Sequence, residues 1–298
     1  MPSLAKSPIA PILGQRVPLR GPARMLFRSY ARTRCEPGTC VQRLTTKHGD
    51  QFDADLSSFL EWYLYAFGAF EEHFAELFGH LIGPGDRCID VGANIGVHTI
   101  RLAKLVGSHG EVIAIEPDAE LAQRTRQNVA INELSNATVL VAAATDHAVK
   151  NLRLYRPSAG DTNKARASLL EHAYLTGDAA TVPGVTVDEV GGGPVRLIKI
   201  DVEGHESAVV AGAAMTIARD RPSVIFEYAP ELLTSQSQSP FGWFADQGYE
   251  MYRVRWARNR LTGRGPLVLD HLPELPEVGG DILAVTAEMV PAIQPLVS

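Results

Sequence analysis

The stretch Asp90-Val-Gly-Ala-Asn-Ile-Gly96 decides the fold of this 298-residue chain. It continues the short apolar run Cys88–Val91 and leads into a helical pattern over residues 97–106. Gly92 and Gly96 allow backbone torsions that other residues avoid and a close approach to a ligand. The start of the helix adds unpaired N–H groups. A strand that turns through small residues into a helix predicts a nucleotide-handling site.

A second acidic strand end supports this prediction. Residues 111–115 have the pattern of a strand and lead into Glu116-Pro117, at the position where a carboxylate holds a ribose hydroxyl. A dinucleotide site requires GxGxxG, but this turn is GxxxG and lacks the glycine beside the pyrophosphate. Asp90 would repel a pyrophosphate but suits a cation. S-adenosylmethionine (SAM) carries a sulfonium, an ammonium and a ribose diol, so SAM is the expected cofactor, and a NAD-type oxidoreductase is the alternative.

Composition indicates a globular protein, with 45% hydrophobic and 21% charged residues. No apolar run approaches the ~18 residues that span a bilayer, and the N-terminus lacks a secretory signal pattern. Three cysteines are present, and Cys35 and Cys40 lack the second pair that a zinc site needs. We expect Cys88 to be a buried thiol and the location to be the reducing cytoplasm.

The net charge of −6 conceals an asymmetry. Residues 1–47 carry nine Lys or Arg and one acid, Glu36, whereas the rest of the chain carries 19 basic and 33 acidic residues. Residues 1–47 are therefore predicted to be a basic arm, in which Arg24, Arg28 and Arg32 would form a stripe on a helix. The stripe suits an anionic partner or another subunit, or it is a solvated charged segment. The acidic remainder argues against nucleic acid as a partner of the core.

Strands and helices alternate along the chain after residue 87. This order predicts an α/β fold with a Rossmann-like, doubly wound, mainly parallel seven-stranded sheet. The pattern changes between 146 and 190, which predicts a small insertion, an antiparallel flap, between the third and fourth core strands. A helical region is expected over 52–82, with a break at Gly68. The predicted strands are 87–91, 111–115, 138–143, 196–201, 223–228, 249–255 and 280–286, the last of them at a sheet edge. The predicted helices of the core are 97–106, 118–132, 206–219 and 240–247.

A second charged stretch, Leu197–Glu206, has the sequence LIKIDVEGHE. Lys199, Asp201 and Glu203 alternate with apolar residues and share one face of a predicted strand. Charges are unusual there, because helices normally cover both faces of a parallel sheet. An unpaired buried charge costs several kcal/mol, so these charges must pair or face a cleft. The run ends at the edge where α/β sheets bind ligands, which makes it the best candidate for chemistry.

Each charged residue of this run has a candidate role in methyl transfer to a hydroxyl, which needs an aligned acceptor and a base. His205 titrates near neutral pH and is the natural base, while Asp201 either orients it or is itself the base. Lys199 either keeps Asp201 ionised, polarises the acceptor, or forms a structural ion pair. Glu227, at the end of the next strand, completes the pocket. Asp201, Glu203 and Glu227 could hold a divalent metal, but their spacing is no metal signature and no metal ligand is assigned.

Six segments together resemble the FkbM family of SAM-dependent methyltransferases. They occur in the family's order over about residues 60–230 and are Pro84–Thr99, Ala114–Pro117, Arg126–Asn132, Val185–Val190, Leu197–Glu206 and Arg221–Tyr228. The resemblance implies a class I methyltransferase fold and O-methyl transfer to a hydroxyl of a sugar or specialised metabolite. The SAM-binding residues that it implies are Asp90, Gly92, Asn94, Gly96, Glu116, Pro117 and Asp146.

The expected organisation is a basic arm over 1–47, a methyltransferase domain over 48–290 and a tail over 291–298. The domain includes the helical lead-in 52–82 and the insertion 146–190. The expected partner is a small hydroxyl acceptor such as a sugar, glycolipid or polyketide-like molecule, and a homo-oligomer is compatible with the chain. A non-catalytic SAM-binding or scaffold protein is a further alternative, against which the charged run argues.

Overall fold

The computed structural model of the chain describes residues 38–157, 167–169, 179–230, 239–257 and 265–298. The chain forms two compact units. The first comprises Met1–Glu72, Ala159–Ala165 and Trp256–Pro266, and the second comprises His73–Ser158, Arg166–Arg255 and Leu267–Ser298. The predicted arginine stripe lies outside the described residues, so it stays a prediction.

The first unit contains a hairpin and a helix. Strand β1 (Val41–Thr45) pairs antiparallel with β2 (Gln51–Asp55), and helix α3 (Phe59–Phe67) follows. The helix ends at Gly68, which adopts the left-handed conformation with φ 72° and donates its N–H to Leu64. The break at Gly68 is therefore confirmed. The prediction of helix from residue 52 is wrong, because Phe52 and the residues around it alternate in burial along a paired strand, and the hairpin also takes in part of the predicted arm.

The cysteines differ in state. Cys88 is a free, fully buried thiol, as predicted, and burial raises its pKa. Cys40 is disulfide-bonded, which removes the cysteine-based argument for a reducing compartment. No helix within the described ranges has both the length and the apolar character needed to cross a bilayer. The cytoplasmic location stays a prediction.

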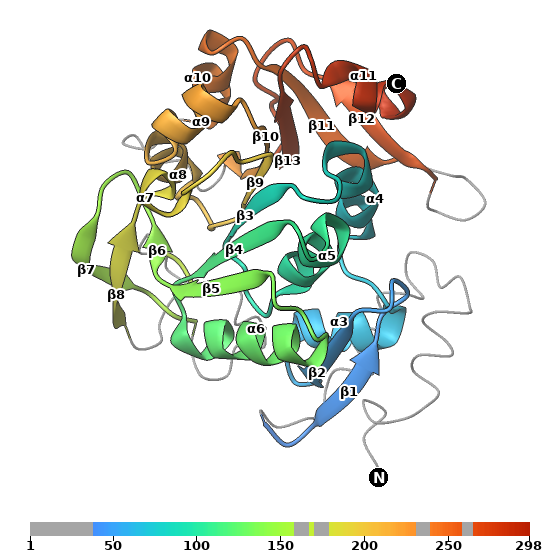
Figure 1. The fold of residues 1–298 in the computed structure, drawn as a ribbon, viewed down its shortest axis with the longest axis vertical. Coiled ribbons are helices and arrows are strands. Elements are labelled where there is room, and N and C mark those ends of the chain that lie inside the picture. The colour runs from blue at the N-terminus through green and yellow to red at the C-terminus, as the bar shows by residue number, and fades with distance from the viewer. Residues whose placement is uncertain (1–37, 158–166, 170–178, 231–238, 258–264) are drawn as a thin grey trace. The chain divides into compact units, whose positions relative to one another are not determined.

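The second unit is built around an eight-stranded sheet with the order β12-β11-β13-β10-β9-β3-β4-β5 (Figure 1). The strands are β3 (Arg87–Val91), β4 (Glu111–Glu116), β5 (Ala137–Val141), β9 (Leu197–Ile200), β10 (Ser223–Tyr228), β11 (Glu250–Trp256), β12 (Leu267–His271) and β13 (Gly280–Val285). Neighbours from β5 to β10 pair in parallel, and β13 pairs antiparallel with both β10 and β11. The doubly wound, mainly parallel α/β architecture is confirmed. The strand predicted last is not an edge strand, and the unpredicted β12 makes the eighth.

Helices of the second unit are α4 (Glu72–Leu81), α5 (Val97–Val106), α6 (Ala119–Ile131), α7 (Val187–Val190), α8 (Glu206–Ala211), α9 (Ala214–Asp220), α10 (Pro240–Asp246), α11 (Val290–Ile293) and the 3-10 turn η5 (Gln294–Leu296). The predicted helix 118–132 is α6, which Asp118 caps by accepting the N–H of Glu120 and Leu121. The predicted helix 206–219 is instead two helices, α8 and α9, separated at Gly212 and Ala213. A side chain at Gly212 would overlap the carbonyl oxygen of Thr145.

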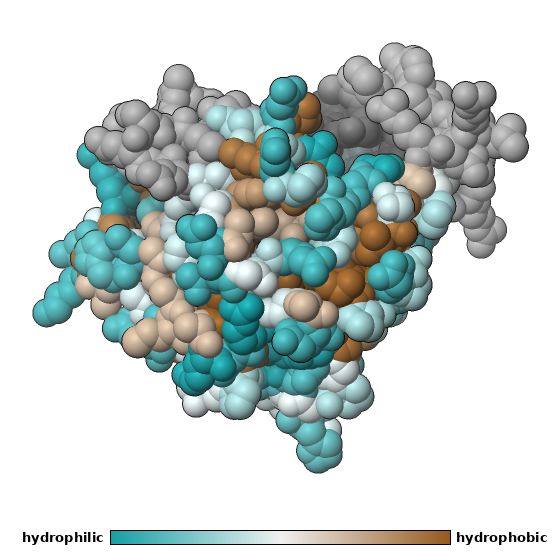
Figure 2. Space-filling view, turned by 90° about the horizontal axis from the view of Figure 1, so that it is seen from above, coloured by the Kyte–Doolittle hydropathy of each residue, from teal (hydrophilic) through white to brown (hydrophobic). Residues whose placement is uncertain are grey.

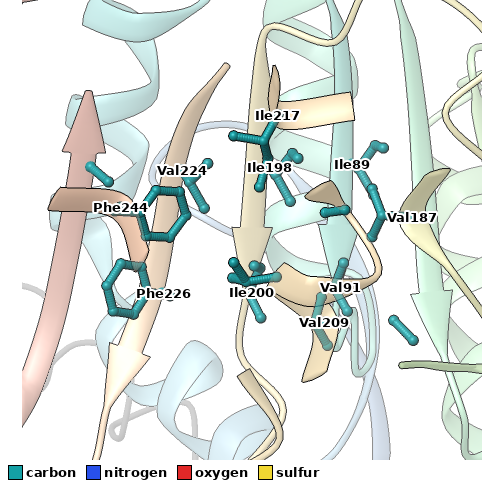
Figure 3. Packing of buried hydrophobic residues seen from close by; sticks show 14 of the residues in the cluster. Ile89, Val91, Val187, Ile198, Ile200, Val209, Ile217, Val224, Phe226 and Phe244 are labelled. Atoms are coloured by element: carbon teal, nitrogen blue, oxygen red, sulfur yellow. The ribbon is translucent and has the colours of Figure 1, made fainter. Parts of the chain in front are cut away.

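One face of the sheet carries the main apolar core. Ile198 and Ile200 of β9 pack with residues of β3, β10 and helices α8 to α10 (Figure 3). These side chains are almost completely buried. Burial of each is worth about 1.5–3 kcal/mol, so this face anchors β9 firmly. Because side chains alternate along a strand, Lys199 points to the opposite face.

The insertion forms a separate three-stranded sheet of β6 (Ala143–Ala144), β7 (Val149–Leu154) and β8 (Ala180–Val185). Strands β7 and β8 pair antiparallel, whereas β6 and β8 pair parallel. The expected antiparallel flap is thus confirmed for β7 and β8 and extended by β6. We call these strands the insertion sheet.

The molecular face in Figure 2 shows polar and apolar residues interspersed. Over the described ranges, the large apolar side chains that are exposed are Val41, Met215, Leu275 and Val278. Single exposed apolar residues are ordinary on protein surfaces. They give no reason to place a binding surface there.

Candidate functional site

The DVGANIG turn joins β3 to α5 through three residues with positive φ: Gly92 at 80°, Asn94 at 53° and Gly96 at 88°. The N–H groups of Gly92 and Ala93 donate to the carbonyl of Ile115, at 2.9 and 3.2 Å. A Cβ on Gly92 would overlap the carbonyl oxygen of Asp201. Glycine is required here partly because another strand of the protein, rather than only a ligand, comes close to the turn.

Asp90 and Lys199 are register partners on β3 and β9 and lie on the same face of the sheet. Asp90 is 0% exposed and accepts a hydrogen bond from Thr99 at 2.6 Å. The Lys199 side chain is 3% exposed, and its Nζ lies 3.7 Å from Asp90 Oδ1 and 3.2 Å from Asp201 Oδ2. Of the charges predicted on this face, Lys199 and Asp201 therefore pair with each other, and Lys199 also pairs with Asp90. Lys199 bridges a residue of the glycine turn to a residue of the second charged stretch.

Glu116 stands at the end of β4 with a side chain that is almost fully enclosed. Its Oε2 accepts the N–H of Asn94 at 2.8 Å, and its Oε1 accepts the N–H of Asp118 at 2.9 Å. Burial raises the pKa of Glu116 to about 7, and these two hydrogen bonds oppose the rise. Pro117 continues the chain between Glu116 and the cap of α6. The carboxylate thus ties the glycine turn to the end of β4.

His205 precedes α8 and approaches the insertion sheet. Its Nε2 lies 3.2 Å from the hydroxyl of Thr145, and that hydroxyl donates to Asp146 Oδ1 at 3.2 Å. Burial lowers the pKa of His205, while the charge of Asp146 opposes this effect. Asp146 also contacts His147 Nδ1 at 2.6 Å. Thr145, rather than Asp201, is the hydrogen-bond partner of His205 in the part of the chain that the structure describes.

The pKa of Asp146 is lowered overall. Partial burial raises it, but the hydrogen bonds from His147 and Thr145 outweigh that effect. Sequence reasoning assigned Asp146 to the cofactor and did not single out Thr145. A threonine at the end of an alanine-rich run carries no motif, so no signal in the sequence could have found it.

Acidic side chains gather at the carboxyl ends of β9 and β10. Burial raises the pKa of Glu227 to about 8, and the charges of Asp201, Glu203, Asp281 and Glu206 raise it further. Glu227 and Asp281 are register partners on β10 and β13. No group of three His, Cys, Asp or Glu residues within the described ranges is arranged to hold a metal ion.

Two other residues fix the loop between β9 and α8. Glu203 has a φ of 52°, and its carbonyl accepts a hydrogen bond from Ser168 at 3.0 Å. Glu206 accepts the N–H of Gly204 at 3.1 Å, and burial raises its pKa to about 6. These bonds hold the loop that carries His205 in one shape.

The raised pKa of Glu227 predicts a pH dependence of stability. The folded protein binds this proton more tightly than the unfolded chain, whose Glu titrates near 4.5, so stability falls as pH rises from about 4.5 to about 8. Glu227→Gln should therefore be more stable than the wild type at pH 9, by about 2 kcal/mol after allowance for partial exposure. Urea denaturation at pH 5 and pH 9 measures this difference, with the exposed Glu277→Gln as control. Equal pH dependence of Glu227→Gln and wild type would contradict it.

Comparison with known proteins places the chain in a family. A family model described as the methyltransferase FkbM domain matches residues 90–251. A curated relative, protein-L-isoaspartate O-methyltransferase of Ignicoccus hospitalis, is 29% identical over 121 residues, covering 40% of this chain and 49% of the relative. The chain thus matches about half the length of that relative.

Solved structures give weaker likenesses. The methyltransferase FkbM of Methylobacillus flagellatus KT has a TM-score of 0.43 and 15% identity, over 68% of this chain and 44% of that chain. A precorrin-6y C5,15-methyltransferase of Geobacter metallireducens GS-15 has a TM-score of 0.41 and 12% identity, over 73% of this chain and 88% of that chain. The family model, by contrast, spans more than half of this chain and includes both charged stretches of the site. The chain therefore belongs to the FkbM family of SAM-dependent methyltransferases.

Proposed function

We propose that this protein moves a methyl group from SAM to a hydroxyl of a sugar or specialised metabolite. The observation that carries the proposal is His205, held at the carboxyl end of β9 by a hydrogen bond to Thr145. Burial lowers the pKa of His205, so the ring is neutral at pH 7 and able to take a proton. A hydroxyl needs such a base when its oxygen attacks a methyl carbon.

The glycine turn and the end of β4 have groups that fit SAM. Asp90 is a buried carboxylate whose Oδ1 forms an ion pair with Lys199 at 3.7 Å but has no hydrogen-bond partner among the described residues, so it keeps an acceptor site for a polar group of the donor. Each Glu116 oxygen has one backbone partner and keeps a lone pair for a ribose hydroxyl. When bound, SAM supplies a methyl group on a sulfonium that becomes a neutral thioether. The residues proposed to hold SAM are Asp90, Gly92, Asn94, Gly96, Glu116, Pro117 and Asp146.

The protein's own groups divide the remaining work. His205 takes the proton of the reacting hydroxyl. Asp201 accepts a hydrogen bond from a neighbouring hydroxyl of the acceptor, which aligns it, and a sugar diol presents such a pair. Lys199 Nζ lies 3.2 Å from Asp201 Oδ2 and holds this side chain in place through the ion pair. Glu203 and Glu227 are proposed to line the acceptor site.

The negative charge around Glu227 constrains the charge of the acceptor. Asp201, Glu203, Glu206 and Asp281 all act on Glu227 strongly enough to raise its pKa. An anionic acceptor would meet the same repulsion. A neutral hydroxyl compound is therefore favoured over a carboxylate, although the curated relative is named as an isoaspartate O-methyltransferase.

Membership of a methyltransferase family argues against the NAD-type oxidoreductase. A non-catalytic SAM-binding protein is separated from an enzyme by experiment. Calorimetric titration with SAM and with NAD should detect SAM binding alone. SAM labelled in its methyl group should then transfer label to free sugars, methyl glycosides or a macrolactone. An isoaspartyl peptide is included in the same assay as the acceptor that offers a carboxylate. Label in an O-methyl ether supports the proposal, whereas label only in a methyl ester, or SAM binding without transfer to any compound, contradicts it.

Asp201→Ala should slow methyl transfer while SAM affinity stays within about twofold, because the side chain acts on the acceptor. The expected loss is about 10²-fold in kcat, the usual scale for a positioned polar group. Initial rates with the best acceptor and calorimetry with SAM measure the two effects. The exposed Asp246→Ala is the control. Full activity of Asp201→Ala would remove β9 from the proposed chemistry.

The partners beyond the acceptor remain proposals. The basic arm over residues 1–47 is proposed to contact an anionic partner or another subunit, on the basis of its charge alone. Only residues 38–47 of that arm are described, and of these Arg43 pairs with Asp53 within the hairpin. A homo-oligomer is likewise compatible with the chain, and light scattering of the full-length protein tests it.

A further inference from the structure

Three side chains form a hydrogen-bonded series from the insertion sheet to α8. The Thr145 hydroxyl donates to Asp146 Oδ1 at 3.2 Å, and His205 Nε2 lies 3.2 Å from the same hydroxyl oxygen. A hydroxyl has only one proton to give. Since the ionised carboxylate is the stronger acceptor, that proton goes to Asp146. The oxygen of Thr145 then accepts from His205, and the proton of the neutral ring resides on Nε2.

The protein fixes Thr145 from three directions. Its N–H donates to the carbonyl of Val185 at 2.9 Å. Its carbonyl oxygen occupies the space where a side chain of Gly212 would lie, and its methyl group would be 3.0 Å from a Cβ on Gly184. Thr145 is also 4% exposed. With the methyl group against Gly184, the hydroxyl is directed to His205 and Asp146 rather than free to rotate away.

We infer that Thr145 is a positioning residue that selects the Nε2–H tautomer of His205 and so leaves Nδ1 as the atom that receives the acceptor's proton. This inference rests on the proposed role of His205 as base. On transfer, the acceptor O–H bond breaks and its proton forms an N–H bond at Nδ1. The electron pair left on oxygen forms the new bond to the methyl carbon, and the bond from that carbon to sulfur would break with its pair kept by the leaving thioether. The imidazolium then carries protons on both nitrogens, and Asp146 faces its charge across Thr145. Solvent takes the Nδ1 proton before the next cycle.

The tautomer can be measured without any acceptor. Nitrogen-15 NMR of histidine-labelled protein distinguishes a protonated from an unprotonated ring nitrogen, and His205→Gln identifies the His205 signals by their loss. In the wild type and in Thr145→Ser, which keeps the hydroxyl, Nδ1 should show the shift of an unprotonated nitrogen. Thr145→Val keeps the shape but removes the hydroxyl, and it should shift the His205 signals toward a mixture of tautomers. A protonated Nδ1 in the neutral wild-type ring, or unchanged His205 signals in Thr145→Val, would overturn the inference.

A second variant keeps the test decisive if Thr145→Val does not fold. Asp146 is half exposed, so Asp146→Ala should fold, and it frees the Thr145 proton to donate to Nε2. His205 should then move toward the Nδ1–H tautomer, and unchanged signals would contradict the inference. Activity gives a further readout, since Thr145→Val should lower kcat about 10²-fold with the KM for SAM unchanged, and Thr145→Ser should restore most of it. If the wild type transfers no methyl group to hydroxyls, the proposed function is wrong. The NMR spectra still decide independently whether Thr145 selects the tautomer of His205.

Discussion

Gly92→Ala is expected to lower the free energy of unfolding by about 4 kcal/mol, the largest effect of any single methyl group added to this turn. The residue has a φ of 80°, which costs an alanine about 1–2 kcal/mol. The new Cβ would also overlap the carbonyl oxygen of Asp201, and forced packing of this kind costs about 1–3 kcal/mol. The obstacle is backbone, so no side-chain rotation relieves it. Urea denaturation followed by circular dichroism measures the loss.

Gly85→Ala is the matched control for this prediction. Gly85 has a φ of 91°, but nothing lies within 4 Å of the Cβ that an alanine would add. It should therefore cost only the conformational part, about 1–2 kcal/mol. Similar losses in the two variants would show that the approach of Asp201 to the turn does not matter for stability. Gly92→Ala should also weaken SAM binding, whereas Gly85→Ala should not.

His205→Gln is expected to reduce kcat about 10³-fold, within the range that general-base catalysis contributes. Glutamine retains a polar group near Thr145 but has no nitrogen that takes a proton at neutral pH. SAM affinity should change by less than about twofold, because His205 is not among the residues proposed to hold SAM. Initial rates of label transfer and calorimetric titration give the two numbers.

The control for this second prediction is His109→Gln, since His109 is exposed in the turn before β4. It should retain the wild-type rate. A His205→Gln variant with an undiminished kcat would show that another group takes the proton, and Asp201 would be the next candidate. A proportional loss of SAM binding would instead indicate that His205 acts on the cofactor.

Sequence alone could predict the part of the fold that depends on short-range patterns. The strand before the DVGANIG turn, the helix after it and the capped helix α6 each carry their signal within a few residues. The position of β13 in the sheet has no such local signal, because it is set by pairing with β10 and β11. Consecutive strands usually lie side by side, which is why the last predicted strand was expected at the edge.

The start of the helical region shows a different kind of failure. The predicted helical region begins at residue 52, directly before the aromatic residues of α3. In the structure, Phe52 and Ala54 are buried on one face of β2, which pairs with β1. Two alternating apolar positions are too few to outweigh a long helical pattern next to them.

Both stretches that build the candidate site were found in the sequence, the first from its glycine turn between a strand and a helix and the second from the charges on a predicted core strand. The ion pairs of these residues could not be predicted from the sequence. Lys199 contacts Asp90, 109 positions away, only because of the register of β3 and β9. Thr145 was missed for the same reason, since it meets His205 across 60 positions. Contacts of this kind depend on the assembled sheet rather than on any local pattern.

The carbonyl of Asp201 occupies the space that a side chain on Gly92 would need. The distance between the DVGANIG turn and the end of β9 is therefore set by a contact between two main-chain segments. Exchanging side chains at the surface does not stretch or shrink it. The insertion sheet, by contrast, forms a sheet of its own. Thr145, directly after β6, is the hydrogen-bond partner of His205, so the insertion sheet is coupled to the proposed base while the turn and Asp201 keep a spacing set by the main chain.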